Sequence, residues 1–365
     1  KNLCKTLLKT MCIVLGILIL ALLAYIVYLY ASYYRIEDNQ ELVVEAPVDD
    51  TTTGAAAVLA TDTEYSAVTY NIGFGAYLPD YSFFMDGGTS SWAESPETVQ
   101  YAINGAGELV KSLDPDFALI QEIDLDATRS YHTDEYEMLR NILPEYTTVF
   151  AQNYDSAFLF YPFTQPHGSS RAGLGLFSKY PVSSALRRSF PISTSFSKFF
   201  DLDRCYSVSR IPVDNGKELV IFNLHMSAYG NSDAIRKGQI EMLCNDMAKE
   251  YEAGNYVLCG GDFNHDLKAS EEDAENCESW AFPFPRTELP EHFAFCLDLL
   301  SSEEKKALWN SARNADMEYV PGVTYTVTLD GFIISDNIEC LSYENINTGY
   351  SYSDHDPVKV DFVLK

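Results

Sequence analysis

The segment Tyr256-Val-Leu-Cys-Gly-Gly-Asp-Phe-Asn264 decides the fold of this chain. It begins with an apolar run of strand length, Tyr256–Cys259, and ends in Gly-Gly followed by polar side chains. In isolation, Asp262 at such a place is more often part of a turn or a helix cap than a catalytic group. The segment gains its meaning from the other strand-length runs of the chain, several of which also end or begin with a polar cluster.

Apolar runs of strand length recur from residue 65 onward, and two segments between them have helical periodicity. The expected strands are Ser66–Tyr70, Phe117–Ile120, Ala157–Tyr161, Gly173–Phe177, Glu218–Leu224, Tyr256–Cys259, Gly331–Ile334 and Val358–Val363. The expected helices are Glu97–Leu113 and Asp233–Tyr251. Strands mixed with helices predict one large α/β domain. Residues 266–320 are less regular and are expected to form an insertion or a long loop region beside the active site.

Polar side chains stand at the ends of the expected strands, and each of them alone is ordinary. An Asn after a strand is usually a turn residue, and a lone buried histidine is usually a core residue with a satisfied ring. Several such groups at strand ends can nevertheless converge on one crevice, because the strands hold them rigidly. The ordered set is Tyr70-Asn71, Gln121-Glu122, Asn223-Leu-His225, Gly261-Asp262-Phe-Asn264, Leu329-Asp330-Gly-Phe and Ser353-Asp354-His355-Asp-Pro357.

This ordered set resembles the endonuclease/exonuclease/phosphatase superfamily, which includes deoxyribonuclease I, apurinic endonucleases, bacterial sphingomyelinases and inositol polyphosphate phosphatases. The segment Gly173-Leu-Gly-Leu-Phe-Ser-Lys-Tyr-Pro181 also looks like the core strand of that family, which ends in Ser-(Lys/Arg)-x-Pro. The resemblance runs from about residue 65 to the C-terminus. It implies a four-layer α/β sandwich, in which two mixed β-sheets pack face to face and helices lie outside.

The resemblance also implies a metal-dependent site that uses Mg²⁺, with Mn²⁺ able to substitute. It makes Glu122 the main metal ligand. The amide oxygen of Asn71 is expected to be a second hard donor, and Asp354 a further ligand to the metal or to its water. Such a site is chemically sensible, because Mg²⁺ takes a few hard oxygens and keeps several waters.

The remaining residues of the set fall into catalytic roles. Asp262 would orient or deprotonate the attacking water, with Asn264 donating to water or phosphate. His225 and His355 would face the phosphoryl oxygens, and Asp330 would orient His355 by accepting from its ring. Whether Asp262 or His355 is the base stays open. A rare basic cluster in this acidic chain consists of Arg171, Arg187, Arg188, Arg204 and Arg210, and Arg171 is the member expected to bind substrate phosphate.

The N-terminal sequence predicts a membrane anchor. No charged residue lies between Lys9 and Arg35, and this stretch is long enough to cross a bilayer as one helix. Tyrosines crowd its far end, as in an interfacial belt, and lysines precede it. These features predict a single-pass protein of the cell membrane, with a cytoplasmic N-terminus and an extracytoplasmic catalytic domain. A cleaved signal peptide is the alternative. The expected division is an anchor over 1–35, an acidic linker over 36–64 and the catalytic domain over 65–365.

The composition restricts the substrate. The formal net charge is −28, from 25 Lys+Arg and 53 Asp+Glu, so long-range capture of nucleic acid is disfavoured although a local cationic pocket is allowed. Aromatic runs at Phe158–Phe163 and Phe196–Phe200 can stack on a base, dip into lipid or simply fill the core.

The eight cysteines form no CxxC or Cys/His cluster, which argues against a zinc site. They are expected either to form disulfides or to be buried thiols.

These observations favour a membrane-anchored phosphoesterase that hydrolyses a small or lipid-linked phosphodiester or phosphomonoester by metal-assisted attack of water. The second hypothesis is a membrane-tethered nuclease of the deoxyribonuclease I type, for which nucleic acid would be the partner. The third is a catalytically silent binding module on the same fold. The sequence does not indicate the oligomeric state.

Overall fold

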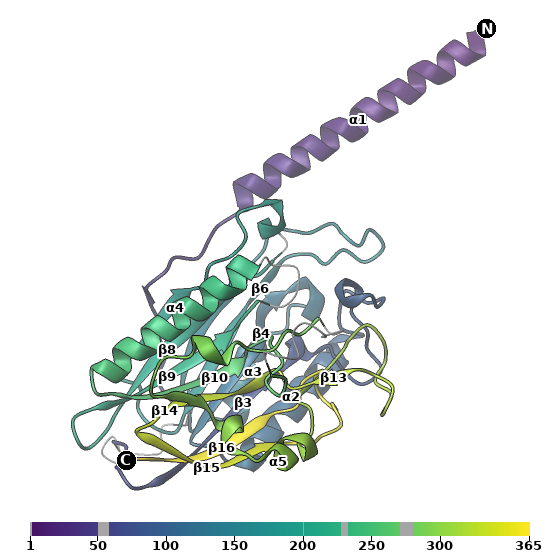
Figure 1. Ribbon diagram of the computed structural model, residues 1–365. Coiled ribbons are helices and arrows are strands. Elements are labelled where there is room, and N and C mark those ends of the chain that lie inside the picture. The colour runs from purple at the N-terminus through teal and green to yellow at the C-terminus, as the bar shows by residue number, and fades with distance from the viewer. Residues whose placement is uncertain (1, 50–57, 200, 228–232, 271–279) are drawn as a thin grey trace.

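A single long helix projects from an α/β body in the computed structural model (Figure 1), which describes residues 2–49, 58–199, 201–227, 233–270 and 280–365. The helix, α1 (Asn2–Ser32), is long and apolar enough to cross a membrane, and an 18-residue window within it has a mean hydropathy of 2.9. The expected apolar helix at the N-terminus is therefore confirmed.

Two seven-stranded sheets form the body. One has the order β1 (Gln40–Glu41), β7 (Ser184–Ser189), β8 (Cys205–Pro212), β9 (Glu218–His225), β10 (Tyr256–Asp262), β14 (Asp330–Ser335) and β11 (Phe293–Phe295). The other has the order β15 (Ile338–Asn345), β16 (Val358–Leu364), β3 (Glu64–Asn71), β4 (Phe117–Ala127), β6 (Ser170–Ser178), β5 (Thr147–Asp155) and β2 (Val44–Glu45). Both sheets are mixed, because β9 runs parallel to β10 and β3 runs parallel to β4 within otherwise antiparallel neighbours.

The two sheets share one buried core. Leu119 of β4 and Leu176 of β6 belong to the same hydrophobic cluster as Phe222 of β9 and Leu258 of β10. Burial of this apolar surface is the main force that holds the sheets together. A polar bridge crosses the core close to the site, where Gln121 Nε2 donates to Asn223 Oδ1 at 2.8 Å.

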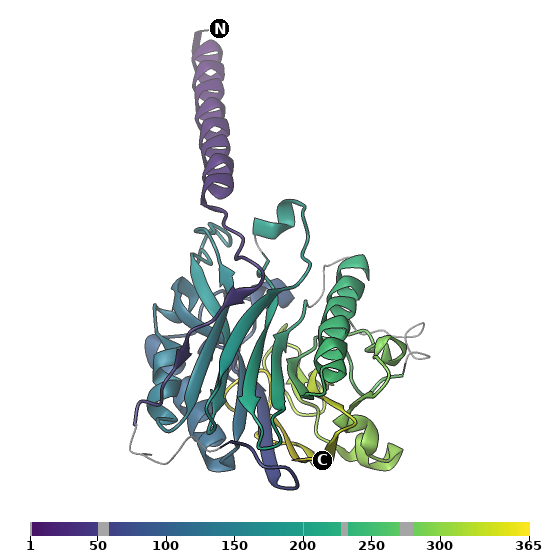
Figure 2. The same cartoon turned by 90° about the vertical axis from the view of Figure 1, so that its left-hand side faces the viewer.

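Helices cover the outer faces of both sheets. On one side, α2 (Pro96–Leu113) and α3 (Glu135–Ile142) pack on the β3–β4–β6 face through residues such as Val99, Ile103 and Leu139. On the other side, α4 (Asp233–Glu252) packs on the β9–β10 sheet through Ile240 and Leu243 (Figure 2). Ser95 begins α2 with a capping box, which satisfies backbone N–H groups that the helix leaves free. The predicted sandwich of two mixed sheets with helices outside is confirmed.

The other elements in the described part of the chain are short. They are α5 (Ser302–Ala307), the strand pair β12 (Ala312–Arg313) and β13 (Thr326–Val327), and the 3₁₀ turns η1 (Gly73–Gly75), η2 (Phe84–Asp86), η3 (Thr128–Ser130), η4 (Phe196–Phe199), η6 (Arg286–Glu288) and η7 (Cys296–Leu299). Described residues between 266 and 320 thus have little regular structure, in agreement with the sequence. Residues 40–45 add short strands to both sheets, since β1 pairs with β7 and β2 pairs with β5.

One predicted strand was wrong. Residues Ala157–Tyr161 form an irregular segment that makes only an isolated bridge, between Leu159 and Gly168. The apolar side chains that suggested a strand pack instead on the last turns of α1, where Leu159 joins Leu29 and Phe199 in a small cluster. Leu159 is therefore buried, but against a helix more than a hundred residues away in the sequence and not within a sheet.

The cysteines in the described residues are not disulfide-bonded. Cys205, Cys244, Cys259 and Cys296 are buried thiols, and burial raises the pKa of each. Cys277 lies outside the described residues. Of the two expectations for the cysteines, buried thiols describe these four.

We predict that Gly261 is indispensable to the packing of β10 on β9. Its φ is +146°, and a Cβ there would lie 2.1 Å from the carbonyl oxygen of Leu224. Gly261→Ala should lower the free energy of unfolding by about 2–4 kcal/mol, because both the backbone conformation and the close approach oppose a side chain. Urea unfolding of the full chain in detergent micelles measures this loss.

Gly216→Ala is the matched control. Gly216 also has a positive φ, +80°, but no atom lies within 4 Å of the position of a Cβ. Gly216→Ala should lower the free energy of unfolding by only about 1 kcal/mol, which is the cost of the left-handed backbone conformation alone. Equal losses for the two variants would contradict a special role for the Gly261 contact.

Candidate active site

Backbone register brings the strand-end residues of each sheet together. In one sheet, Asn71 at the end of β3 lies opposite Gln121 of the parallel strand β4. In the other, Asp262 at the end of β10 lies opposite His225 of the parallel strand β9. Asp330 lies opposite Asp262 on its other side, because the antiparallel strand β14 begins where β10 ends. Polar groups from five strands therefore gather at one edge of the sandwich.

Glu122 is aimed into this crevice by an irregularity of its strand. Its φ is +56°, and the register of β4 with β6 shifts at this point. Such a bulge redirects a side chain that would otherwise follow the alternation of the strand. Asn71 Nδ2 donates both to Glu122 Oε1 and to Asp262 Oδ2, each at 3.1 Å, and so connects carboxylates of the two sheets. The amide oxygen of Asn71 accepts from the backbone N–H of Gly73 at 3.0 Å.

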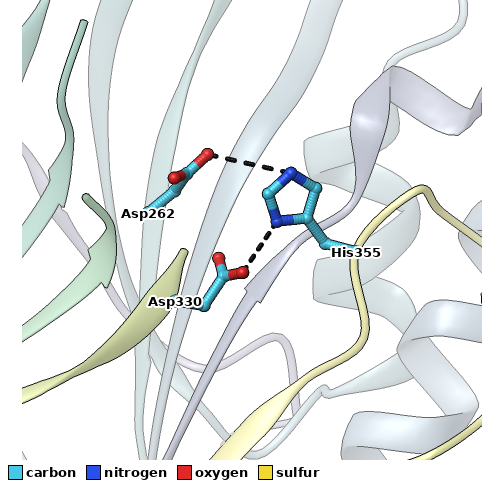
Figure 3. Close-up of side chains that lie close together, drawn as sticks. All are labelled: Asp262, Asp330 and His355. Carbon is cyan, nitrogen blue, oxygen red and sulfur yellow. Dashed lines mark hydrogen bonds and ion pairs between the residues drawn. The ribbon is translucent and has the colours of Figure 1, made fainter. Parts of the chain in front are cut away.

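Asp330, His355 and Asp262 form a buried row (Figure 3). His355 Nδ1 lies 2.8 Å from Asp330 Oδ2, which also accepts from the Ser311 hydroxyl at 2.7 Å. His355 Nε2 points toward Asp262 and lies 3.9 Å from its Oδ2. Burial alone would lower the pKa of His355, but the carboxylates of Asp330, Asp262 and Asp354 together raise it well above its usual value. The ring is thus fixed in orientation and favoured as a cation.

His225 and Asn264 complete the surroundings of Asp262. His225 Nε2 is 3.5 Å from Asp262 Oδ2, and burial, with Arg204 nearby, holds the pKa of His225 well below its usual value. The backbone N–H of Asn264 donates to Asp262 Oδ1 at 2.8 Å, and its side chain donates to the carbonyl of Met226 at 2.9 Å. Burial raises the pKa of Asp262. The two histidines that face Asp262 therefore differ, one favouring the charged form and the other the neutral form.

Three carboxylates face the same space and repel one another. Burial raises the pKa of Asp354 to about 6, and Glu122 adds to this rise while His355 opposes it. Burial raises the pKa of Asp86 to about 7, with further contributions from Asp354 and Glu122. A bound divalent cation would relieve this repulsion, and carboxylate oxygens are the ligands that Mg²⁺ prefers. The donor set of Glu122 and Asp354 therefore fits Mg²⁺, and Asn71 would join it after turning its amide oxygen toward Glu122.

A second arrangement also satisfies the geometric requirement for a metal. One ligand atom from each of Asp262, Asp330 and His355 lies within 4.8 Å of the others. However, His355 Nδ1 and Asp330 Oδ2 are already hydrogen-bonded to each other, and Asp330 is completely buried. Two candidate donor sets for a divalent cation thus lie at the same edge of the sandwich, one at Glu122 and Asp354 and the other at the row in Figure 3.

The crevice opens into a pocket of about 970 Å³. Several residues of the crevice line it, namely Asp86, Glu122, His225, Asp262, Asn264, Asp354 and His355. Its lining also includes three arginines, Arg129, Arg204 and Arg313, and an apolar wall formed by Phe74, Phe83, Phe84, Met85, Leu159 and Tyr161. Arg129 is held by both oxygens of Asp124, and Arg313 donates to backbone carbonyls, among them Leu78 at 2.9 Å. The pocket thus combines acidic, basic and apolar walls.

Arg204 is the arginine best placed to meet a substrate anion. It is 7% exposed, and its Nε and Nη1 atoms have no hydrogen-bond partner among the described residues. Its contact with Asp201 is long, at 3.9 Å. The structure does not bring Arg171 into the pocket, since that side chain is half-exposed on β6 and pairs with Asp126 at 3.1 Å.

Most of the residues that the sequence proposed for the site lie together in the structure. The structure brings together Asn71, Glu122, His225, Asp262, Asn264, Asp330, Asp354 and His355. Sequence reasoning missed Asp86, Arg129 and Arg313 as pocket residues, because none of them follows or precedes a predicted strand. Arg204 belonged to the basic cluster, and its neighbourhood could not be inferred from spacing.

Comparison with known proteins gives a family and a fold. The model of the Endonuclease/Exonuclease/phosphatase family matches residues 68–299, a range that contains Asn71, Glu122, His225 and Asp262. Among curated proteins, none matches the chain with significance.

Similar solved structures cover most of this chain. An endonuclease/exonuclease/phosphatase from Beutenbergia cavernae has 15% identity and a TM-score of 0.54, covering 82% of this chain and 72% of its own. The human Nocturnin catalytic domain with bound sulfate anion has 17% identity and a TM-score of 0.53, and the match covers 83% of this chain and 95% of that chain. D. rerio TDP2 complexed with single strand DNA product has 14% identity and a TM-score of 0.54, and the match covers 82% of this chain and 99% of that chain. At these identities the likeness shows the fold.

Proposed function

This chain belongs to the endonuclease/exonuclease/phosphatase family, and on that premise we propose that it is a Mg²⁺-dependent phosphoesterase anchored to the membrane by α1. Its substrate is a phosphodiester or phosphomonoester, and the attacking nucleophile is water. The observation that carries the proposal is the convergence of Glu122, Asp262 and the Asp330–His355 pair at one edge of the sandwich. Mn²⁺ is expected to substitute for Mg²⁺.

The protein groups divide the work of hydrolysis among them. Asp262, held by hydrogen bonds from Asn71 and Asn264, orients the attacking water or takes its proton. His355, held by Asp330, presents Nε2 to the phosphoryl oxygens, and His225 lies on the other side of Asp262. Glu122 and Asp354, with Asn71, would hold the metal, which would supply positive charge to offset the negative charge of the reacting phosphoester. The bond from water oxygen to phosphorus forms, the ester P–O bond breaks, and the leaving oxygen receives a proton.

We favour a small or lipid-linked substrate over a polynucleotide. A net charge of −28 opposes the long-range capture of nucleic acid, and the basic side chains at the site line a pocket that is also acidic and apolar. A membrane-tethered nuclease remains the alternative, supported by the three pocket arginines and by the likeness to TDP2, whose structure holds a DNA product. A catalytically silent binding module is disfavoured, because the full set of polar groups is assembled.

The topology proposed from the sequence places the N-terminus in the cytoplasm and the catalytic domain outside it. Lys1, Lys5 and Lys9 lie before the uncharged apolar stretch of α1, and Glu37 and Asp38 follow the helix. The division into an anchor over 1–35, a linker over 36–64 and a catalytic domain over 65–365 belongs to the same proposal.

Metal dependence tests the proposed function directly. The full chain should hydrolyse bis(4-nitrophenyl) phosphate with Mg²⁺ or Mn²⁺, and EDTA should abolish turnover, because unneutralised carboxylates repel an anionic substrate. Glu122→Gln should lower kcat by about 10²–10⁴-fold. It should also weaken the binding of Mn²⁺, which electron paramagnetic resonance measures. Glu108→Gln, an exposed change on α2, is the matched control. Turnover that survives chelation would refute the metal mechanism.

Asp330 is predicted to act as a positioning residue for His355. Asp330→Asn and His355→Ala should each lower kcat by about 10²–10⁴-fold with little change in KM, and the double variant should lose little more than either single one. Asp336→Asn is the matched control, since Asp336 holds His292 Nδ1 at 2.7 Å on the surface. Additive losses, or a normal rate for Asp330→Asn, would show that the two residues do not act as a unit.

Arg204 is predicted to bind the substrate anion in place of Arg171. Arg204→Gln should raise KM about 10–100-fold, the effect of losing one charge-assisted hydrogen bond. Arg171→Gln should leave KM unchanged, because Arg171 faces solvent beside Asp126. Steady-state kinetics of both variants decides between the two arginines, and a larger effect at Arg171 would reverse the assignment.

A further inference from the structure

The last turns of α1 are joined to the wall of the pocket. Leu29 packs against Leu159 and Phe199, and all three side chains are buried in one small cluster. The backbone N–H of Phe158 donates to the Tyr28 hydroxyl at 3.0 Å, and the Tyr25 hydroxyl donates to the carbonyl of Phe158 at 3.3 Å. In both views the teal segments that contain these residues gather around the foot of α1 (Figures 1 and 2). The apolar helix is thus docked on the loop that follows β5.

Beside this junction, aromatic side chains face outward. We call Phe160, Tyr161, Phe163 and Phe196 the aromatic collar, and their exposed fractions are 50%, 62%, 85% and 47%. Clustered exposed rings of this kind are unusual on a surface that meets only water. The same rings are favourable in the interfacial layer of a bilayer, where aromatic side chains concentrate. The end of a helix apolar enough to span a membrane marks that layer.

The collar and the pocket share a loop. Leu159, which contacts Leu29 of α1, also lines the pocket, and so does Tyr161 of the collar. The Tyr161 ring lies 5.9 Å from that of Phe84, another member of the apolar wall. A molecule that leaves the interfacial layer beside the collar would therefore meet the apolar wall first and the polar crevice after it.

We propose that the aromatic collar lies in the interfacial layer of the membrane that α1 spans, and that the pocket takes the phosphoester headgroup of a lipid from the same leaflet. The inference rests on the proposed function and names its substrate class. The apolar wall would cover the part of the lipid next to the phosphate. Water would attack phosphorus, one ester P–O bond would break, and the released oxygen would take a proton, so no other reactant is needed.

The position of the collar can be measured without any turnover. The full chain carrying Phe163→Trp is reconstituted in phosphatidylcholine vesicles with brominated acyl chains. We expect the fluorescence of the new tryptophan, taken as the difference from the wild-type signal, to be strongly quenched. Tyr101→Trp is the matched control, because Tyr101 is 58% exposed and belongs to α2, a helix that lies away from the foot of α1 (Figure 1). Equal quenching of the two positions would overturn the placement of the collar.

Delivery of a lipid is tested by comparing two kinds of substrate, soluble and lipid, in the same proteoliposomes. The substrates are bis(4-nitrophenyl) phosphate in solution and the lipids of phosphatidylcholine, phosphatidylethanolamine, phosphatidylglycerol and sphingomyelin vesicles, with products followed by ³¹P NMR. The double variant Phe160→Ser/Phe163→Ser should lower turnover of the cleaved lipid by about tenfold or more and leave the soluble substrate unchanged, since neither ring lines the pocket.

The outcomes separate the two proposals. The lipid inference is contradicted if the wild-type chain hydrolyses the soluble ester but none of the lipids. It is also contradicted if the double variant changes the turnover of both kinds of substrate alike, or of neither. In both cases the proposal of a phosphoesterase is unaffected. If the wild-type chain hydrolyses no phosphoester with Mg²⁺, the proposed function itself falls, whatever the position of the collar.

Discussion

The register of β10 between β9 and β14 is the constraint on which the site depends. Backbone hydrogen bonds place Asp262 opposite both His225 and Asp330, so three side chains are positioned before any of them makes a contact of its own. A slip by one residue would send these side chains to the other face of the sheet. Gly261 permits the register, because it lets β10 approach the Leu224 carbonyl closely. The geometry of the proposed active site is therefore set first by the main chain.

The second sheet supplies the complementary half of the site through few contacts. Asn71 donates to carboxylates of both sheets, and Gln121 donates across the core to Asn223. The resulting crevice is polar and incompletely satisfied, since His225 Nδ1, Asp330 Oδ1 and two nitrogens of Arg204 have no partner among the described residues. Leaving buried polar atoms unpaired destabilises a fold. This is the expected pattern where a substrate and a cation provide the missing interactions.

The sequence predicted the parts of the site that depend on strand ends and missed those that depend on tertiary contact. Asn71, Asp262 and His355 could be placed because a strand-length run fixes where each polar group must emerge. Ala157–Tyr161 was misread as a strand because its apolar partner is α1, and no local pattern reveals that partner. Arg171 and Arg204 look alike in the sequence, yet only Arg204 lies in the pocket, because long-range packing decides which arginine turns inward.

A docked apolar helix, a shared loop and a strand-end crevice form a continuous path from the foot of α1 to the site of the proposed chemistry. The central claim is that this crevice directs water at the phosphorus of an ester. Hydrolysis of bis(4-nitrophenyl) phosphate in ¹⁸O-labelled water tests it most directly, with ³¹P NMR and mass spectrometry of the products. The account predicts one solvent oxygen in each molecule of 4-nitrophenyl phosphate and none in the 4-nitrophenol. Label in the 4-nitrophenol, or its absence from the phosphate product, would contradict attack of water at phosphorus.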